Sequence, residues 1–475
     1  MKHTKIVATI SDLRCDVGFV RSLYESGMNV VRMNTAHMDH EGINRIITNV
    51  REVSDDIAIL MDTKGPEIRT TVLDKSLEIS LGQKLKLKGA PGVKSSSDCI
   101  CVSYDKIVDD VSVGSNILID DGEIDLKVVE KDDEYLYCEA LNNGELGSRK
   151  SVNVPGVRIN LPSLTEKDIS NIGFAIEKDI DFIAHSFVRS AQDVNDIQKL
   201  LDAKNSKIKI IAKIENQEGV ENIHEILDVV YGVMVARGDL GIEIAQEKIP
   251  GIQRHLIREC VLAKKPVIVA TQMLHSMIKY PRPTRAEVTD IANAIYYRTD
   301  ALMLSGETAY GQFPVESVKT MARIAEEAEK TKMAANDIRI PFSHDDHDVT
   351  AFLSKQAVKA ASRVNTKAVL TDSSTGRTAR ILAAFRGRNP VYAQCYNKRT
   401  MRELALSYGV FASYLPADEN SKEYICSFVK DLISKKLIRE QDLVLYLGGS
   451  VGIGGGTFIE LFEAGKPLQA QKDDK

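Results

Sequence analysis

Short apolar runs separated by amphipathic segments occupy most of the first two thirds of the chain. Runs that close on polar or charged residues lie at residues 5–10, 30–34, 57–63, 181–187, 208–215, 232–239, 266–272 and 301–307. Continuous apolar runs of this length are typical of strands buried on both faces, as in parallel sheets. The segments between them have helical periodicity; Val194, Ile197 and Leu201, for example, form one apolar stripe.

Eight such strand–helix units predict an α/β fold of the TIM (β/α)8 barrel type, in which active sites lie at the carboxyl ends of the strands. A doubly wound open sheet would also fit the local pattern, but eight units favour closure of the sheet. One long interruption separates the third strand from the fourth, at residues 70–161. There apolar and polar residues alternate between turn residues, which is typical of antiparallel strands.

The chain is therefore expected to contain three domains. The barrel is predicted at residues 1–69 and 162–338, with a small inserted β-barrel lid domain at 70–161. A less hydrophobic linker follows, and a C-terminal open α/β regulatory domain is predicted at 345–475, with strands near 366–372, 389–395 and 442–450. Because the insertion leaves the barrel at a strand's carboxyl end, the lid is expected to overhang the active site.

Composition restricts the class of protein. The chain has 475 residues, 43% hydrophobic and 27% charged, with a formal net charge of −5. These values are typical of a soluble globular protein and give no general reason to expect nucleic acid or a membrane as partner. Seven cysteines without a CxxC pair indicate a reducing compartment. With no apolar signal core and no apolar run of roughly 20 residues, a cytoplasmic location is predicted.

Ionisable residues gather at the predicted carboxyl ends of the strands. Lys213 and Glu215 are two residues apart, so on a strand they point to the same face. Alone, this pair reads equally well as a solvated surface pair or as part of an active site. The neighbouring strand ends favour the second interpretation, because they supply Arg32, Asn34, Asp62, Thr63, Lys64, Asp239 and Thr271.

In a closed barrel these ends meet at one mouth. Glu215 and Asp239 are then candidates to hold one Mg²⁺, since two carboxylates plus substrate and water oxygens suit that ion. Lys213 would be a fixed positive charge for an anionic substrate. The sequence therefore predicts a site for an anion and a metal ion.

Other candidate motifs are weaker. The stretch SSTGRT at 373–378 lies between a predicted strand and helix, which favours a phosphate-binding loop. The glycine-rich residues 449–456 are equally well explained as a surface turn. His37, His40, His185 and His275 have no metal-ligand spacing and are interpreted as non-metal residues.

Several long motifs bring a known family into view. The segments VVRMNTAH, MDTKGPEIRT, IIAKIENQEGVENI, VARGDLGIEI, ATQMLHSM, PRPTRAEVTDIANA and LSGETAYGQFPVESV resemble the successive signatures of the pyruvate kinase family. The similarity also covers the insertion (ILIDDGEI, LPSLTEKD) and the C-terminal domain. The family fold has the same barrel, insertion point and C-terminal α/β domain.

The resemblance implies phosphoryl transfer from phosphoenolpyruvate to ADP, giving pyruvate and ATP as the final step of glycolysis. By the family pattern Glu215 and Asp239 hold Mg²⁺ (or Mn²⁺), and Lys213 stabilises charge on the phosphoryl group and the enolate. Arg32 pairs with the phosphate, the backbone of Gly238 and Asp239 binds the carboxylate, and Thr271 belongs to the relay that protonates the enolate. The positions matching nucleotide contacts are Asn34, His37, Arg69 and Lys167.

The resemblance also implies K⁺, with ligands at Asn34, Asp62 and Thr63. The family's usual serine ligand is Ala36 here, whereas Glu67 is the residue associated with K⁺-dependent members; we expect K⁺ to activate, more weakly than usual. The loop Ser373, Ser374, Thr375, Gly376, Arg377 and Thr378 matches the family's effector phosphate loop, so a phosphate-bearing effector is predicted. Residues 11–14 depart from the family near the base site, which leaves base preference open. A homotetramer is implied.

Two other functions fit parts of the pattern. An aldolase or lyase of the wider phosphoenolpyruvate-and-pyruvate barrel group also uses Glu and Asp to bind a metal–enolate, but has no need of Arg69 and Lys167 as a nucleotide clamp. A catalytically inactive sensor of phosphometabolites would fit the departures at Ala36, His185 and His275. Intact Lys213, Glu215, Asp239 and Thr271 favour an active kinase.

Overall fold

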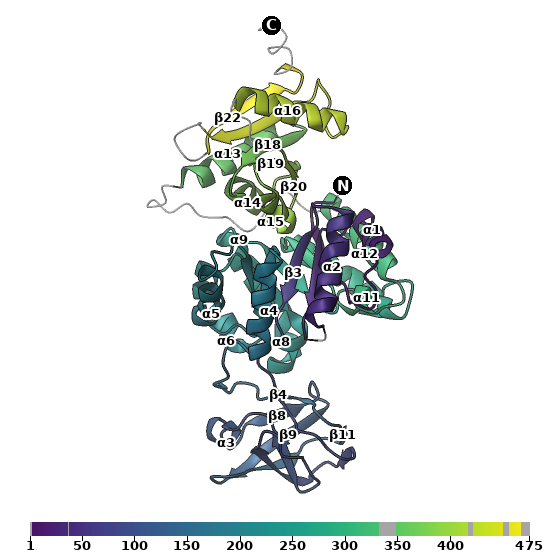
Figure 1. Ribbon diagram of the computed structural model, residues 1–475, viewed down its shortest axis with the longest axis vertical. Coiled ribbons are helices and arrows are strands. Elements are labelled where there is room, and N and C mark those ends of the chain that lie inside the picture. The colour runs from purple at the N-terminus through teal and green to yellow at the C-terminus, as the bar shows by residue number, and fades with distance from the viewer. Residues whose placement is uncertain (1, 37, 332–347, 417–420, 450–455, 467–475) are drawn as a thin grey trace.

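The computed structural model describes residues 2–36, 38–331, 348–416, 421–449 and 456–466. The molecule is elongated, with the barrel between the other two parts (Figure 1). The inserted strands, residues 68–153, lie beyond one end of the barrel, and the C-terminal region lies against the other end. The carboxyl ends of the barrel strands, here called the mouth, lie at the end that carries the insertion; the amino ends are called the base.

A closed barrel of parallel strands forms the centre of the molecule and confirms the predicted TIM barrel. Around the barrel the strand order is β1-β17-β16-β15-β14-β13-β3-β2. Barrel strands that follow one another in the sequence are therefore neighbours in space. The strands are β1 (Lys5–Thr9), β2 (Val30–Asn34), β3 (Ala58–Asp62), β13 (Phe182–His185), β14 (Lys209–Ile214), β15 (Gly232–Ala236), β16 (Val267–Ala270) and β17 (Ala301–Leu304).

Helices surround the barrel and bury one apolar face against it. They are α1 (Val17–Glu25), α2 (His40–Val53), α4 (Glu166–Glu177), α5 (Ala191–Asp202), α7 (Ile223–Val229), α9 (Ile249–Leu262), α10 (Arg285–Tyr296) and α12 (Pro314–Thr331). Shorter helices lie near the mouth: α6 (Gln217–Glu221), α8 (Arg237–Glu243), η1 (Gln246–Lys248), η2 (His275–Ile278) and α11 (Gly306–Ala309). Capping boxes begin α4 at Thr165 and α10 at Thr284, satisfying backbone N–H groups at both helix starts.

Side chains of the barrel strands divide between two apolar layers. Residues such as Val7, Leu60, Phe182 and Met234 fill the barrel interior, whereas alternate residues pack outward beneath the helices. Both faces of each strand are thus buried, which is why the strands read as continuous apolar runs rather than alternating ones.

The insertion contains an antiparallel sheet that closes on itself. The strands of the insertion are β4 (Ile68–Arg69), β5 (Leu77–Ile79), β6 (Lys84–Gly89), β7 (Cys99–Val102), β8 (Asn116–Ile119), β9 (Ile124–Lys131), β10 (Leu136–Ala140), β11 (Gly144–Leu146) and β12 (Ser151–Asn153). Strands β5 and β11 form a separate two-stranded sheet. The main sheet has the order β4-β12-β8-β9-β10-β6-β7, with β6 and β7 parallel. A bridge between Thr70 and Val102 joins its two edges. One short helix, α3 (Ile107–Asp110), is an exception to the expected all-β character.

The C-terminal region is an open sheet with helices on its faces. The strand order is β20-β19-β18-β21-β22, parallel except for β22. The strands are β18 (Ala368–Ser373), β19 (Val391–Cys395), β20 (Val410–Tyr414), β21 (Leu443–Gly449) and β22 (Gly456–Glu463). The helices are α13 (Val349–Arg363), α14 (Arg377–Ala384), α15 (Lys398–Glu403), η3 (Leu404–Leu406) and α16 (Ser421–Ser434). Strands β20 and β22 were not among the predicted ones.

Within the described residues, the structure contains no helix that is both long enough and apolar enough to span a membrane.

Candidate active site

Lys213 lies near the end of β14, with its ammonium group among three oxygen-bearing side chains. Lys213 Nζ donates to Ser186 Oγ at 2.7 Å and lies 3.1 Å from Asp62 Oδ1 and 2.9 Å from Glu215 Oε1. Of these three contacts only that to Ser186 is a hydrogen bond; those to Asp62 and Glu215 are ion pairs. Lys213 and Glu215 are therefore not a solvated surface pair: they are buried at the mouth, 9% and 1% exposed.

Arg32, from the middle of β2, completes this buried group. Arg32 Nε donates to Asp62 Oδ2 at 2.8 Å, and a second guanidinium nitrogen also contacts that oxygen. Asp62 therefore lies between Arg32 and Lys213, one on each carboxylate oxygen. We call Arg32, Asp62, Ser186, Lys213 and Glu215 the mouth cluster.

Charge interactions in the mouth cluster shift the protonation of its members. Burial alone would lower the pKa of Lys213, but the carboxylates of Asp62 and Glu215 outweigh it and raise that pKa above its ordinary value. Burial alone would raise the pKa of Asp62, but Arg32 and Lys213 together lower it. Lys213 is thus protonated and Asp62 ionised at neutral pH.

Glu215 is the member whose charge is least compensated. Burial raises the pKa of Glu215 to about 7; Lys213 opposes that shift, while Asp239 and Asp62 add to it. Its Oε2 accepts a hydrogen bond from Phe187 N at 2.8 Å. Its Oε1 is buried and, among the described residues, has no hydrogen bond of good geometry despite the nearby Lys213. A buried oxygen left in this state is suited to a cation.

The backbone at the mouth is strained at two of the barrel's strand ends. Phe187, after β13, has φ 55°, and Thr271 and Gln272, after β16, have φ 68° and 53°. Such angles are uncommon for any non-glycine residue and are genuine outliers for a β-branched one. Strained backbone of this kind clusters at functional sites, where the surrounding structure maintains it.

Gly238 and Thr271 meet across the gap between β15 and β16. Gly238 N donates to Thr271 Oγ1 at 2.8 Å. The neighbouring Arg237 donates to the carbonyl oxygens of Ala270 at 3.3 Å and Thr271 at 2.5 Å. The residue after Gly238, Asp239, contributes its charge to both Lys213 and Glu215. The predicted residues of β14, β15 and β16 are therefore assembled in one place.

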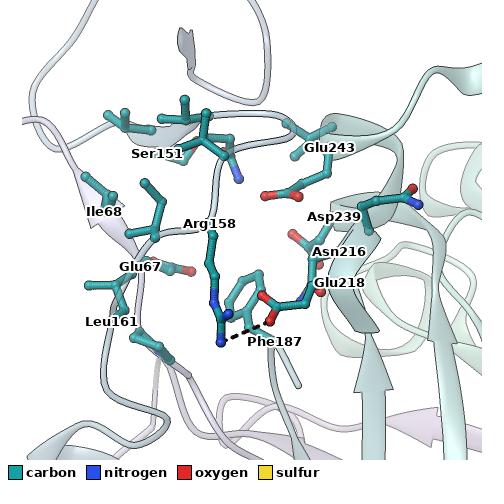
Figure 2. Close-up of a pocket in the computed structure, with 18 of the residues that line it drawn as sticks. Glu67, Ile68, Ser151, Arg158, Leu161, Phe187, Asn216, Glu218, Asp239 and Glu243 are labelled. Atoms are coloured by element: carbon teal, nitrogen blue, oxygen red, sulfur yellow. Dashed lines mark ion pairs between the residues drawn. The ribbon is translucent and has the colours of Figure 1, made fainter. Parts of the chain in front are cut away.

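A cleft of about 770 Å³ opens between the mouth and the inserted domain. One wall carries Asp239, Glu218 and Glu243, and the opposite wall carries residues of the insertion and its return segment (Figure 2). Arg158 points across the cleft toward Glu218, with Arg158 Nη2 3.4 Å from Glu218 Oε1. Burial raises the pKa of Glu243 to about 7. Residues of the insertion thus lie across the cleft from the mouth.

The residues predicted to bind nucleotide or K⁺ lie around this group. Asn34 is paired in register with Asp62, and Thr63 Oγ1 accepts from Ser186 N at 3.0 Å. Lys167 Nζ donates to Ala36 O at 3.1 Å, which brings it to the loop after β2. Arg69 instead pairs with Glu67, its Nε 2.8 Å from Oε2, on the cleft wall.

The remaining predicted residues lie elsewhere. His37 falls outside the described residues, and so does most of the glycine-rich stretch 449–456. The loop 373–378 joins β18 to α14, where Ser373 Oγ accepts from Gly376 N at 2.8 Å and Gly376 has φ 74°. It is therefore placed between a strand and a helix, in the C-terminal region rather than at the mouth.

Two residues at the mouth were missed from the sequence. Ser186 and Arg237 each follow directly after a barrel strand, as the predicted residues do. That position was the available signal, but serine and a single arginine have no spacing that distinguishes them. Their roles appear only in the contacts that they make with residues of other strands.

Comparison with known proteins agrees with this architecture. The model of the pyruvate kinase barrel domain matches residues 1–318, and that of the pyruvate kinase alpha/beta domain matches residues 352–458. Pyruvate kinase of Borreliella burgdorferi is 45% identical over 455 residues, covering 94% of each chain. That of Bacillus licheniformis is 43% identical over 470 residues, 96% of this chain and 79% of the relative.

A solved structure gives the same result. The crystal structure of a pyruvate kinase from Cryptosporidium parvum superposes with a TM-score of 0.91 at 35% identity, over 98% of this chain and 96% of that one. Family models that cover most of the chain and relatives at this level of identity confirm the resemblance predicted from the motifs. The chain is an enzyme of the phosphotransferase class and belongs to the pyruvate kinase family.

Proposed function

We propose that this chain transfers the phosphoryl group of phosphoenolpyruvate to ADP, giving pyruvate and ATP, through the residues of the mouth. The observation that carries the proposal is the protonated, buried Lys213 held among Asp62, Ser186 and Glu215, close to Asp239 on the wall of the cleft. Phosphoryl transfer asks little covalent chemistry of a protein and much positioning and charge stabilisation, which is what this arrangement supplies.

Lys213 and Arg32 are the cations proposed to face the reacting phosphate. Because the pKa of Lys213 is raised, it stays charged and acts as an electrostatic group rather than as a base. Placed in a dry site before the reaction begins, such a charge stabilises the transferring phosphoryl group and the enolate without costly reorganisation. Arg32 is held by Asp62, so its guanidinium is fixed before substrate arrives.

Glu215 and Asp239 are proposed to hold the divalent cation, Mg²⁺ or Mn²⁺. The fit rests on Glu215 Oε1, which is buried and, within the described residues, has an ion pair with Lys213 but no hydrogen bond of good geometry. Burial raises the pKa of Glu215, and the charge of Asp239 adds to that shift. No group of three or more His, Cys, Asp or Glu side chains suited to a metal occurs in the described part of the chain. Substrate and water oxygens would therefore complete the coordination, as is usual for Mg²⁺. When bound, the ion supplies positive charge beside the enolate and carboxylate oxygens.

The substrate carboxylate is proposed to bind the backbone N–H groups of Gly238 and Asp239. In the free protein Thr271 Oγ1 accepts from Gly238 N, so the hydroxyl lies beside the proposed carboxylate position. After phosphoryl transfer the enolate carbon gains a proton, and Thr271 is proposed to belong to the relay that delivers it. Closure of the insertion over the cleft is proposed to exclude water that would compete as phosphoryl acceptor.

ADP is proposed to bind along the side of the mouth that carries Asn34, Arg69 and Lys167, with His37 assigned by family resemblance alone. K⁺ is proposed to bind oxygens of Asn34, Asp62 and Thr63, whose chemistry suits a hard cation. Ala36 lacks the hydroxyl usual at this position, so activation by K⁺ is expected to be weak. Equal rates with and without K⁺ would remove this part of the proposal.

The loop Ser373–Thr378 is proposed to bind a phosphate-bearing effector, with the backbone N–H groups at the start of α14 facing it. Phosphate-bearing metabolites should then change the substrate concentration at half-maximal rate. We further propose that the protein is cytoplasmic and forms a homotetramer. Sedimentation of the purified protein tests the number of subunits.

The central test is pyruvate formation from phosphoenolpyruvate, ADP and Mg²⁺, with and without K⁺, for the wild type and Lys213→Met. Turnover by the wild type and its loss in a folded variant support the assignment. If folded wild type binds phosphoenolpyruvate but forms no pyruvate, even with phosphate effectors added, the kinase proposal fails and a sensor role takes its place.

A further inference from the structure

The turn after β16 has an unusual backbone that requires an explanation. Thr271 and Gln272 both lie in the left-handed region, at φ 68° and 53°. For an L-residue this region is costly, and a β-branched residue such as threonine adopts it least readily. Two successive residues in this state persist only where surrounding contacts hold them.

Arg237 supplies those contacts. Its Nε donates to the carbonyl oxygen of Ala270 at 3.3 Å, and its Nη2 donates to that of Thr271 at 2.5 Å. The two carbonyls flank the Thr271 side chain, so one guanidinium group holds the peptide units on both sides of it. A planar guanidinium can do this because its donors have fixed relative directions, which a lysine ammonium lacks.

Arg237 is itself anchored away from the mouth. Its Nη1 lies 2.6 Å from Asp290 Oδ2 on α10 and donates to Gln253 Oε1 on α9 at 3.3 Å. The Arg237 side chain is 10% exposed. The turn is therefore tied through one side chain to two helices of the barrel, which fixes its position relative to Gly238 and Asp239.

We propose that Arg237 is a positioning residue for the proton-transfer half of the reaction, acting through Thr271. This inference rests on the proposed function and on the role of Thr271 in it. Arg237 donates to protein carbonyl oxygens, to the carboxylate of Asp290 and to Met273 Sδ, and no donor is assigned to the substrate. Its effect is to hold the Thr271 hydroxyl where the enolate carbon is to be protonated.

The two halves of the reaction can be measured separately. In the first, the bond between phosphorus and the enol oxygen breaks and a bond from phosphorus to an ADP oxygen forms, leaving enolpyruvate as its enolate. In the second, the methylene carbon of the enolate takes a proton and becomes the methyl group of pyruvate. The second half run in reverse exchanges pyruvate methyl hydrogens with solvent, which is read by NMR in deuterated water.

The test compares the exchange rate with the phosphoryl-transfer rate in Arg237→Gln and Arg237→Lys. We expect exchange to fall about tenfold or more beyond any fall in phosphoryl transfer, because small displacements of a reacting group are costly. Arg237→Lys keeps the charge and should show the same bias to a smaller degree, which covers the case in which Arg237→Gln fails to fold. Equal falls in both rates would overturn the proposal.

A matched control and a double-mutant cycle sharpen the result. Arg399 donates to the carbonyl of Ile180 at 3.3 Å and pairs with Asp179 at the base of the barrel, so Arg399→Gln should leave the ratio of the two rates unchanged. In the Thr271→Ala background, Arg237→Lys should have little further effect on exchange, since residues that act together are not additive. Independent, multiplying effects would contradict action through Thr271.

The outcomes separate this inference from the proposed function. A wild type without pyruvate formation removes the function itself. A Thr271→Ala variant with normal exchange removes Thr271 from the relay, and with it the proposal. Loss of exchange in Thr271→Ala but not in either Arg237 variant overturns the role of Arg237 alone.

Discussion

The barrel carries buried charges at both of its ends, and the two groups differ in how completely their carboxylate oxygens are hydrogen-bonded. The mouth cluster contains Arg32, Asp62, Ser186, Lys213 and Glu215. At the base a second group, the base cluster, joins the barrel to the C-terminal region; it consists of Arg51, Asp181, Asp300, Arg386 and Arg402.

Every carboxylate oxygen of the base cluster has a hydrogen-bond partner. Asp181 accepts from Arg402 Nε at 2.6 Å on one oxygen and from Arg51 and the backbone of Ile59 on the other. Asp300 accepts from Tyr408 N on one oxygen and from Arg386 at 2.6 Å and Val267 N on the other. A buried ion pair satisfied in this way is structural: it holds two domains in one arrangement.

The mouth cluster lacks that completeness. Glu215 Oε1 has no hydrogen bond of good geometry within the described residues, and Asp239 raises the pKa of Glu215 further. Strained backbone at Phe187, Thr271 and Gln272 lies beside it. Buried charge alone therefore does not distinguish an active site. The distinguishing feature is a buried carboxylate oxygen with unmet accepting capacity, which a cation can use. Left-handed backbone does not distinguish the two ends, because Arg386 of the base cluster also has a positive φ, of 52°.

The largest expected effect is on turnover at the mouth. Lys213→Met should lower kcat by about 10³-fold, because it removes a preorganised charge from a dry site. Steady-state assays with saturating phosphoenolpyruvate, ADP and Mg²⁺ measure this loss, and circular dichroism confirms that the variant is folded. A folded variant within tenfold of the wild-type kcat would exclude Lys213 from the catalytic role.

At the base, replacing a buried cation by methionine should lower stability rather than kcat. Arg386→Met leaves Asp300 buried without its arginine and should lower the free energy of unfolding by about 3–5 kcal/mol. The kcat per folded molecule should stay close to that of the wild type. Urea unfolding measures the loss, with Lys398→Met as control: that residue pairs with Asp55 on the surface, so its removal should cost under about 1 kcal/mol.

His185, at the end of β13, should make stability depend on pH. It is 1% exposed, and neither ring nitrogen has a hydrogen bond of good geometry in the described part of the chain. Burial lowers its pKa to about 4, with Asp193 and Asp168 opposing the shift and Lys213 adding to it. The unfolded chain, with an ordinary pKa near 6.5, then binds more protons between these two pH values.

Stability from His185 is therefore fully present above about pH 6.5 and is lost as pH falls toward 4, by up to about 3 kcal/mol. His185→Leu should remove that part of the pH dependence, measured as the difference between urea unfolding at pH 7 and pH 5. His224, whose side chain is 75% exposed, gives the control His224→Leu. If the free energy of unfolding changed equally between pH 7 and pH 5 in wild type and His185→Leu, the assignment would be contradicted.

The smallest expected effect tests how the mouth cluster orients Lys213. Ser186→Ala removes the 2.7 Å contact to Lys213 Nζ but leaves both carboxylates in place, so kcat should fall by about tenfold. Ser163→Ala, which removes a 2.8 Å hydrogen bond to Asp196, is the matched control and should leave kcat unchanged. If both variants kept full activity, orientation by Ser186 would be unnecessary.

Much of the architecture could be predicted because its signals are local. Apolar runs and helical stripes indicated the barrel, alternation indicated the inserted sheet, and long motifs indicated the family. Two strands of the C-terminal region, β20 and β22, were missed; β20 is half-buried along most of its length, so it lacks a continuous apolar run. The mouth residues were predicted because they follow the ends of apolar runs, and that position can be found from the sequence alone.

What the sequence by itself determined is thus the order of elements and the residue types at the mouth, because periodicity and motif spacing are properties of neighbouring residues. Only the tertiary structure decided which charges meet. Asp62 with Lys213, Ser186 with Thr63, Arg237 with the Thr271 turn and Asp300 with Arg386 are contacts between different strands or domains. Barrel closure and domain packing bring these pairs together, and no local pattern in the chain records them.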